Sequence, residues 1–219
     1  MRLRRKPWAR PELDACDFYI KDPPSLIGKW HGSFKNEQPV FVEFGCGKGG
    51  FIAKTAASEL DVNFIAVDIK SEVLALAKRN IEQEYKNKNL SVDNIKLFSF
   101  DIARIDMVFC GADVVDRIYI NFPNPWPKDS HKKRRLTHTR QLFKYRTFLK
   151  QGGEILFKTD DDELYHDTVE YLRLSGFKIE ENIESLYENG IPKDTVITEH
   201  EKMFFDEGLK IHFIRATNV

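Results

Sequence analysis

The sequence of 219 residues predicts an α/β fold built around a mostly parallel sheet. From residue 40 onward, short apolar runs alternate with segments of helical period, which is the pattern of parallel strands joined by crossover helices. The first run ends in a glycine-rich turn, and the next two end at Asp68 and Asp101. Because parallel strands end at a common edge, these features indicate a ligand site at the carboxyl edge of the sheet.

Seven runs are expected as strands, because each is short, mainly apolar or aromatic, and bounded by polar residues or glycine. They are residues 40–44, 63–67, 95–100, 116–120, 154–158, 177–183 and 210–216. The first five are expected to be parallel, and the last two to close the sheet as an antiparallel pair.

Four segments are expected as helices: residues 51–58, 71–85, 136–150 and 161–175. In the second of them, apolar residues recur at helical spacing from Val73 to Ile81, with Ser71 as the expected N-cap. The glycines around Gly152 are expected to end the third helix, and Gly176 to end the fourth.

Residues 1–35 differ from the rest of the chain in being rich in proline and charge, with Trp8 and Trp30 as isolated aromatics. We expect a basic, irregular N-terminal arm there, followed by one domain at residues 36–219.

Composition excludes several classes of protein. Hydrophobic residues make up 42% and charged residues 31% of the chain, and no run approaches the roughly 20 apolar residues of a membrane span. The N-terminus lacks the apolar centre of a secretory signal, so we expect a cytoplasmic protein. The three cysteines are far apart and the six histidines show no metal-ligand spacing, so we expect neither disulfide nor metal. A monomer or homodimer without an obligate protein partner is expected.

The charge distribution indicates a polyanionic partner although the net charge is zero. Arg2, Arg4, Arg5, Lys6 and Arg10 crowd the first ten residues. Residues 128–150 hold nine Lys or Arg residues and one acid. Two such clusters favour RNA as the partner.

The glycine-rich turn lies in the segment VEFGCGKGGF, residues 42–51. Gly45, Gly47 and Gly49 have no Cβ to keep a ligand from the backbone. Glu43 would repel a pyrophosphate but suits the ammonium group of a methionine moiety. The alternative is an ordinary glycine-rich turn of an α/β domain.

Two further acids extend this pattern along the same edge. Asp68 is placed to accept the two hydroxyls of a ribose, and Asp101 to accept the exocyclic amine of an adenine. Each acid alone is equally compatible with a helix N-cap. Together with Glu43 they indicate S-adenosylmethionine, and the order of elements matches a class I S-adenosylmethionine-dependent methyltransferase, a Rossmann-like fold, better than a dinucleotide-binding fold.

The segment NFPNPWPK, residues 121–128, predicts a rigid loop after the fourth strand. Asn121 and Asn124 offer amide groups, and Trp126 offers a stacking face for a base. The basic run HKKRR, residues 131–135, follows directly and suits a phosphate backbone. The alternatives are a crossover loop with a buried tryptophan, and a solvated charged face.

Two acidic segments complete the edge: FKTD at residues 157–160 and TEHE at residues 198–201. Carboxylates there match the N1–H and N2 amine of guanine, which adenine cannot satisfy. Asp161 and Asp162 are expected to begin the following helix. For Thr198 and Glu201 a solvated loop is an equal alternative.

As a set, these motifs resemble the bacterial tRNA (guanine-N7)-methyltransferase family. The matching pieces are MRLRRKPW, EFGCGKG, NPWPK with HKKRRL, FKTD, and TEHE followed by Gly208. They span nearly the whole chain in one order, and PWPK followed by the basic run is the specific part.

The resemblance implies metal-free methylation of N7 of a guanine in the variable loop of tRNA, with S-adenosylmethionine as the methyl donor. The expected cofactor contacts are Glu43, Gly45, Gly47, Asp68, Asp101 and Asn121. The expected substrate contacts are Lys128, Asp160, Thr198, Glu199, His200 and Glu201. The expected tRNA backbone contacts are Ser130, His131, Lys132, Lys133, Arg134 and Arg135.

One departure affects the catalytic assignment. The family usually has DPWP, with the aspartate taken as catalytic, whereas this chain has NPWP with Asn124 in that place. Guanine N7 carries a lone pair and no proton, so no general base is required. We expect Asn124 to orient the base, and Asp160 with Glu201 to stabilise the positive charge that develops on it.

Three other functions are compatible with parts of the pattern. NPWP is similar to the loops of exocyclic-amine methyltransferases that act on adenine N6 or guanine N2. A non-catalytic RNA-binding module on the same fold is the alternative from another class. A small-molecule dehydrogenase is disfavoured by Glu43 and by the glycine spacing.

Overall fold

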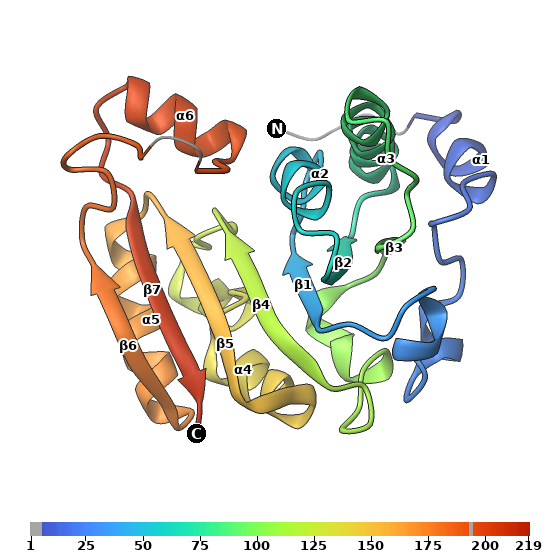
Figure 1. Ribbon diagram of the computed structural model, residues 1–219. Helices are drawn as coiled ribbons and strands as arrows, with labels where there is room; N and C mark the ends of the chain where they lie inside the picture. The colour runs from blue at the N-terminus through green and yellow to red at the C-terminus, as the bar shows by residue number, and fades with distance from the viewer. Residues whose placement is uncertain (1–5, 193–194) are drawn as a thin grey trace.

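The computed structural model describes residues 6–192 and 195–219, and in these ranges seven strands form one sheet (Figure 1). The strands are β1 (Val40–Phe44), β2 (Asn63–Asp68), β3 (Ile95–Ser99), β4 (Val115–Asn121), β5 (Leu149–Thr159), β6 (Phe177–Ile183) and β7 (His212–Asn218). Their order is β3-β2-β1-β4-β5-β7-β6. The first five are parallel, and β7 is antiparallel to both neighbours. The expected fold class is confirmed, and the order reverses between β1 and β4, where such sheets bind ligands.

The helices are α1 (Ala9–Asp14), α2 (Gly50–Ala56), α3 (Ser71–Asn87), α4 (Thr139–Phe148), α5 (Asp162–Leu174) and α6 (Glu199–Asp206). One core joins α1, α2 and α3 to the β1–β3 side of the sheet, through residues such as Ile52, Leu74 and Phe64. A second core packs α4 and α5 on the opposite face, through residues such as Leu142 and Leu164. The sheet therefore has a helical layer on each face, while α6 lies beyond its carboxyl edge (Figure 1).

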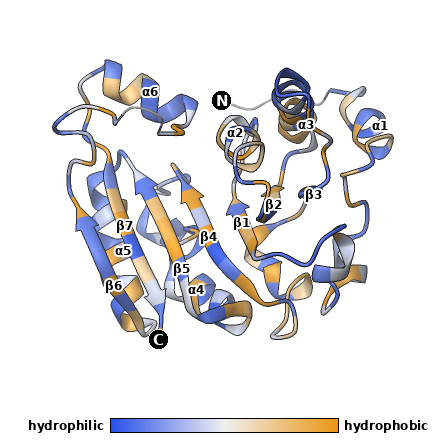
Figure 2. Cartoon of the chain, viewed as in Figure 1, coloured by the Kyte–Doolittle hydropathy of each residue, from blue (hydrophilic) through white to orange (hydrophobic). Residues whose placement is uncertain are grey.

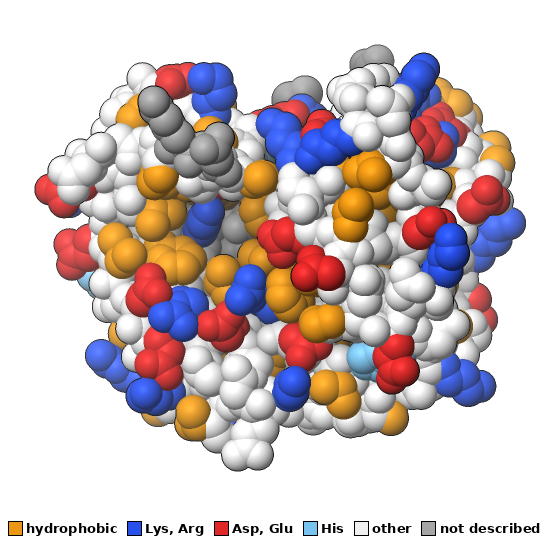
Figure 3. All heavy atoms as spheres, in the orientation of Figure 1, with side chains coloured by type: hydrophobic (Ala, Val, Ile, Leu, Met, Phe, Trp, Pro, Cys, Tyr) orange, Lys and Arg blue, Asp and Glu red, His pale blue; other side chains and the backbone are white. Residues whose placement is uncertain are grey.

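The face of β4, β5, β7 and β6 that is turned toward the viewer in Figure 1 is open to solvent. Arg117 and Arg215 both donate to Glu154 there, at 2.7 and 2.9 Å. Figure 2 shows polar and hydrophobic segments alternating along these strands, and Figure 3 shows acidic and basic side chains gathered over them. This alternation is expected of strands with one buried and one solvated face.

Two expected boundaries are wrong. Lys70, not Ser71, is the N-cap of α3, and the backbone N–H of Lys70 donates to Asp68. The helix expected at 136–150 is shorter, because His138 caps α4 by accepting from Arg140 N and β5 already begins at Leu149. The glycines expected to end that helix lie inside β5, where a Cβ on Gly153 would lie 2.8 Å from a backbone oxygen.

Over residues 6–35 the expected N-terminal arm packs against the domain; Arg2, Arg4 and Arg5 lie outside the described residues. This segment contains α1, and Trp30 is only 1% exposed. Its ring stacks on Phe98 and Phe109 at 5.2 and 5.3 Å, and its Nε1–H donates to the Val108 carbonyl at 2.9 Å. The arm is therefore part of the domain core.

Within the described ranges, none of the helices combines the length and the apolar character that crossing a bilayer requires.

The two N-terminal tryptophans provide a test of this packing. Trp30→Ala should lower the free energy of unfolding by about 3–5 kcal/mol, because it removes a buried aromatic and leaves a cavity. Trp8 is 38% exposed and lies under the Arg79 guanidinium at 4.5 Å, so Trp8→Ala should cost about 1 kcal/mol or less. Urea denaturation of both variants checks this; equal losses would contradict a core role for Trp30.

Candidate functional site

A cleft of about 590 Å³ lies at the carboxyl edge of the sheet, next to the reversal between β1 and β4. Its walls are the turn after β1, the loop after β4 and helix α6, and they include Glu43, Gly47, Asn121, Glu199 and His200. Size and position are typical of a small-molecule site in an α/β protein.

The glycines of the turn have different roles. Gly45, Gly47 and Gly49 all have positive φ, at 79°, 55° and 74°. A Cβ on Gly49 would lie 2.8 Å from the Cβ of Ala77, so this glycine allows α3 to approach the turn. A Cβ on Gly47 would meet nothing closer than 4.0 Å. The backbone at Gly47 is therefore open to a ligand, as the sequence predicted for this turn.

Glu43 lies at the floor of the cleft and is 3% exposed. Its Oε1 accepts a hydrogen bond from Asn121 Nδ2 at 3.0 Å, whereas Oε2 is buried and has no hydrogen-bond partner in the described part of the chain. Burial raises the pKa of Glu43 to about 7, and the negative charges of Asp68 and Glu201 act in the same direction. The Asn121 hydrogen bond and the charge of Lys158 oppose that rise. The floor of the cleft therefore holds a buried carboxyl oxygen with no hydrogen-bond partner among the described residues, and a cationic donor such as an ammonium group would satisfy it.

The two acids that follow along the edge already make backbone contacts. Asp68 Oδ2 accepts from the N–H of Gly47 at 3.2 Å, which joins this carboxylate to the glycine turn. Asp101 is exposed and accepts from Ala103 N at 3.0 Å, so it caps the short 3₁₀ helix after β3. Both carboxylates have further lone pairs for a ligand.

The loop after β4 has a strained backbone, and its rigidity stays a prediction. Phe122 and Trp126 have positive φ, at 48° and 46°, which bulky side chains rarely adopt. Asn124 Oδ1 accepts from Trp126 N at 3.1 Å, and the Pro125 carbonyl accepts from Arg135 Nε at 2.6 Å. The Trp126 ring is half-buried under the Arg134 guanidinium at 5.1 Å, so one of its faces is covered.

The basic run is divided between structural and exposed residues. Arg135 is 0% exposed and pairs with Asp167 and Glu163 on α5, so its expected phosphate contact is wrong. Lys132 Nζ lies 2.5 Å from Glu163 and 3.1 Å from Asp167.

The other cations of this region are exposed. Within the described part of the chain, no ion-pair partner is found for Lys128, Lys133 or Arg134.

The three acids after β5 also differ in role, because two of them make structural contacts and one is exposed. Asp161 caps α5 by accepting from Leu164 N at 2.7 Å, as predicted. Asp162 lies 2.8 Å from His212 Nε2. Asp160 is exposed, and among the described residues its carboxylate has neither a hydrogen-bond nor an ion-pair partner.

The segment TEHE begins a helix, α6, that was not expected from the sequence. Thr198 and Glu201 form a capping box, for which the spacing T-x-x-E was an available signal. Glu201 is 0% exposed, and its Oε1 accepts from Lys158 Nζ and Tyr187 OH, both at 2.6 Å. The expected contact of Glu201 with a base is therefore wrong, because this carboxylate anchors α6 to β5 instead.

Other residues of α6 form the outer wall of the cleft. Glu199 lies 3.5 Å from Lys48 of the glycine turn. The Phe122 ring, from the loop after β4, lies 5.9 Å from His200 and 5.5 Å from Phe204. The sequence carries no signal for the place of Phe122 in this wall, because its contacts with His200 and Phe204 depend on the position of α6.

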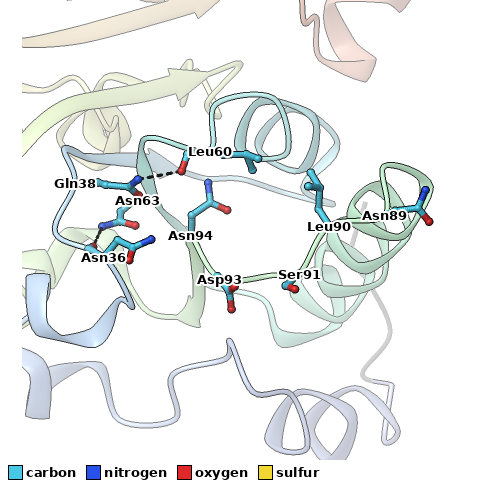
Figure 4. A pocket seen from close by; sticks show the side chains of 9 residues that line it. All are labelled: Asn36, Gln38, Leu60, Asn63, Asn89, Leu90, Ser91, Asp93 and Asn94. Atoms are coloured by element: carbon cyan, nitrogen blue, oxygen red, sulfur yellow. Dashed lines mark hydrogen bonds between the residues drawn. The ribbon is translucent and has the colours of Figure 1, made fainter.

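A different hollow, of about 350 Å³, lies at the amino edge of the sheet and is rich in carboxamides (Figure 4). There Asn63 donates to the Asn36 carbonyl at 2.8 Å and Gln38 to the Leu60 carbonyl at 3.1 Å. Asn94 donates to three further carbonyls. These amides fasten the loops below the sheet, so this hollow is structural.

A search of the described ranges finds no group of three or more His, Cys, Asp and Glu side chains with the geometry of a metal site.

Residues 37–214 match the model of a protein family described as "Putative methyltransferase". A tRNA (guanine-N(7)-)-methyltransferase of Clostridium beijerinckii is 54% identical over 216 residues, which cover 99% of this chain and 98% of that protein. A protein of the same name from Clostridium perfringens is 54% identical over 217 residues, covering 99% of each chain.

Among solved structures, an antibiotic-related methyltransferase superimposes with a TM-score of 0.62 at 19% identity, covering 91% of this chain and 96% of that one. A 16S rRNA (adenine(1408)-N(1))-methyltransferase from Catenulisporales acidiphilia, solved with its cosubstrate SAM, gives 0.61 at 16% identity, covering 91% and 92%. These two likenesses establish the class I methyltransferase fold. The two Clostridium proteins are 54% identical to this chain over nearly its whole length, and this chain therefore belongs to the tRNA (guanine-N7)-methyltransferase family.

Proposed function

We propose that this chain transfers a methyl group from S-adenosylmethionine to N7 of a guanine in the variable loop of tRNA. The observation that carries the proposal is the 54% identity, over 99% of the chain, to proteins named for that reaction. The cleft supports it, because the buried carboxyl group of Glu43 and the open backbone at Gly47 fit the methyl donor.

The fit to S-adenosylmethionine follows from three features. The Oε2 of Glu43, which has no partner among the described residues, would hold the ammonium group. The open backbone at Gly47 admits the ligand beside Asp68, which would take the ribose hydroxyls. Gly45, Asn121 and Asp101 complete the set of proposed contacts. When bound, S-adenosylmethionine supplies a methyl group whose bond to sulfur breaks as a bond to the acceptor nitrogen forms.

The work of the protein is to position the guanine and to stabilise positive charge on it. Because N7 has an in-plane lone pair and no proton, no side chain need act as a base. Asn124 orients the base but supplies no negative charge, whereas the free carboxylate of Asp160 stabilises the charge that moves onto the ring. Lys128, Thr198, Glu199 and His200 remain proposed substrate contacts.

The tRNA backbone would lie along the exposed part of the basic run. Lys133 and Arg134 have no acidic partner among the described residues, so their charges are available to phosphates. Ser130 and His131 are proposed as neighbouring contacts. Lys132 is proposed as a weaker contact, since Glu163 and Asp167 already neutralise it.

The raised pKa of Glu43 predicts opposite effects on stability and on binding. Folding raises this pKa from 4.5 to about 7, so the stability that Glu43 contributes is complete below pH 4.5 and is lost as the pH rises through 7. Glu43→Gln should therefore be more stable than the wild type at pH 8, by up to ~3 kcal/mol, with a smaller difference at pH 5. The same variant should bind S-adenosylmethionine at least about tenfold more weakly, because the charged acceptor is lost. Urea denaturation at both pH values and calorimetry of cofactor binding test the two effects, and unchanged cofactor affinity would refute the role of Glu43.

The proposed division between Asp160 and Asn124 is tested by single-turnover kinetics. Asp160→Asn should lower the methylation rate by about 10²-fold, because it removes the charge that stabilises the methylated ring. Asn124→Ala should lower it by less than about tenfold, because only orientation is affected. The substrate is unmodified tRNA with labelled cofactor, and strand cleavage by aniline after borohydride reduction locates N7-methylguanine. Equal losses of rate in the two variants would overturn the proposed roles of Asp160 and Asn124. If tRNA took up the labelled methyl group but its strand was not cleaved by aniline, an exocyclic amine would be favoured as the acceptor.

The basic run provides a matched pair for tRNA binding. Replacing Lys133 and Arg134 together by alanine should weaken binding and reduce the slope of log K against log salt by up to about two, because two phosphate contacts are lost. Lys132→Ala should change the slope little and should mainly lower stability, because Glu163 and Asp167 lose a partner. Filter binding across a salt series measures both. A slope change at Lys132 equal to that of the double variant would show that the run binds as one patch.

A further inference from the structure

The turn between β5 and α5 carries three consecutive acids, of which two are fixed by structural contacts. Asp161 caps α5 through Leu164 N, and its own N–H donates to Thr159 Oγ1 at 3.1 Å. Asp162 is held by His212 at 2.8 Å. Asp160 stands between the buried Thr159 and this pair of acids, so the direction of its carboxylate depends on how firmly the turn is held.

His212 is the part of this arrangement that the proposed mechanism has not used. It begins β7, pairs with Thr159 in the antiparallel ladder, and is 3% exposed. Its ring stacks on Tyr165 of α5, with 4.3 Å between centroids and 14° between planes. The Tyr165 hydroxyl in turn donates to Asn182 of β6 at 2.8 Å. The stack therefore ties the turn to the β6–β7 hairpin.

The two nitrogens of His212 are in different environments. Nε2 faces the Asp162 carboxylate, whereas Nδ1 is buried without a hydrogen-bond partner among the described residues. Because the Asp162 carboxylate accepts hydrogen bonds, Nε2 is assigned as the nitrogen that carries the donating hydrogen. His212 then donates to Asp162, which fixes the residue that begins α5.

We infer that His212 is a positioning residue for methyl transfer, acting through Asp162 to hold the turn that presents Asp160. The inference rests on the proposed function. The turn adjoins the loop after β4, since the carbonyl of Lys158, two residues before Asp160, accepts from Phe122 N at 2.9 Å. A shift of about 1 Å in a positioned group can cost up to 10²-fold in rate, so a released turn should slow the reaction.

The test compares two replacements of His212 that differ in one donor. His212→Phe keeps an aromatic ring on Tyr165 but cannot donate, whereas His212→Gln restores an N–H donor. His212→Phe should lower kcat about tenfold, with the affinity for S-adenosylmethionine and the KM for tRNA unchanged within about twofold. His212→Gln should recover most of kcat. A merely structural role would instead make both variants lose stability without this separation of kcat from KM.

A double-mutant cycle tests whether His212 acts through Asp162. Asp162→Ala should show the same loss of kcat as His212→Phe, and the double variant should be no slower than either one. Glu170→Ala is the control on the same helix, because Glu170 is exposed and pairs with Arg173. Additive losses, or His212→Gln as slow as His212→Phe, would overturn the positioning role. An unaltered chain that leaves no N7-methylguanine in tRNA would instead refute the proposed function itself.

Discussion

The buried ion pair between Lys158 and Glu201 is the interaction on which the geometry of the cleft depends. Glu201 is 0% exposed, and it closes the capping box of α6 while accepting from Lys158 of β5 and from Tyr187. Removing one member of such a pair is costly, because the other is left as an uncompensated buried charge. The pair therefore holds α6 against the sheet, and with it Glu199 and His200 in the wall of the cleft.

The same lysine takes part in a wider balance of charge. Its positive charge opposes the rise in the pKa of Glu43, whereas Asp68 and Glu201 promote it. Burial remains the largest cause of that rise. A cationic ligand beside Glu43 would favour the ionised form of this carboxyl group, so ligand binding and the protonation of Glu43 are linked. The glycine turn contributes the complementary feature, which is backbone that a ligand can approach.

Sequence patterns predicted those features that depend on neighbours along the chain. The five parallel strands were recognised because each is a short, mainly apolar run bounded by polar residues or glycine, and Asp161 because a cap lies next to its helix. Features that depend on distant partners were missed or misread. Trp30 was placed in an irregular arm because its partners Phe98 and Phe109 lie far along the chain. Arg135 looks like Arg134 in the sequence, and only the acids of α5 distinguish the buried residue from the exposed one. The capping box at Thr198 and Glu201 is a local pattern, and it was present in the sequence but not used.

Asn124 stands where the family usually has aspartate, and the effect of this replacement on the shape of the loop can be separated from its effect on charge. Asn124 Oδ1 accepts from Trp126 N, a contact that an amide oxygen makes as well as a carboxylate oxygen does. The turn of the loop, and the left-handed conformation at Trp126, are therefore compatible with either residue. What the replacement removes is one negative charge at this edge. Because N7 of guanine has no proton to lose, that charge is needed only to stabilise the methylated ring, and a neighbouring carboxylate can supply it. Asp160 has no competing partner among the described residues, which makes it the side chain suited to that role.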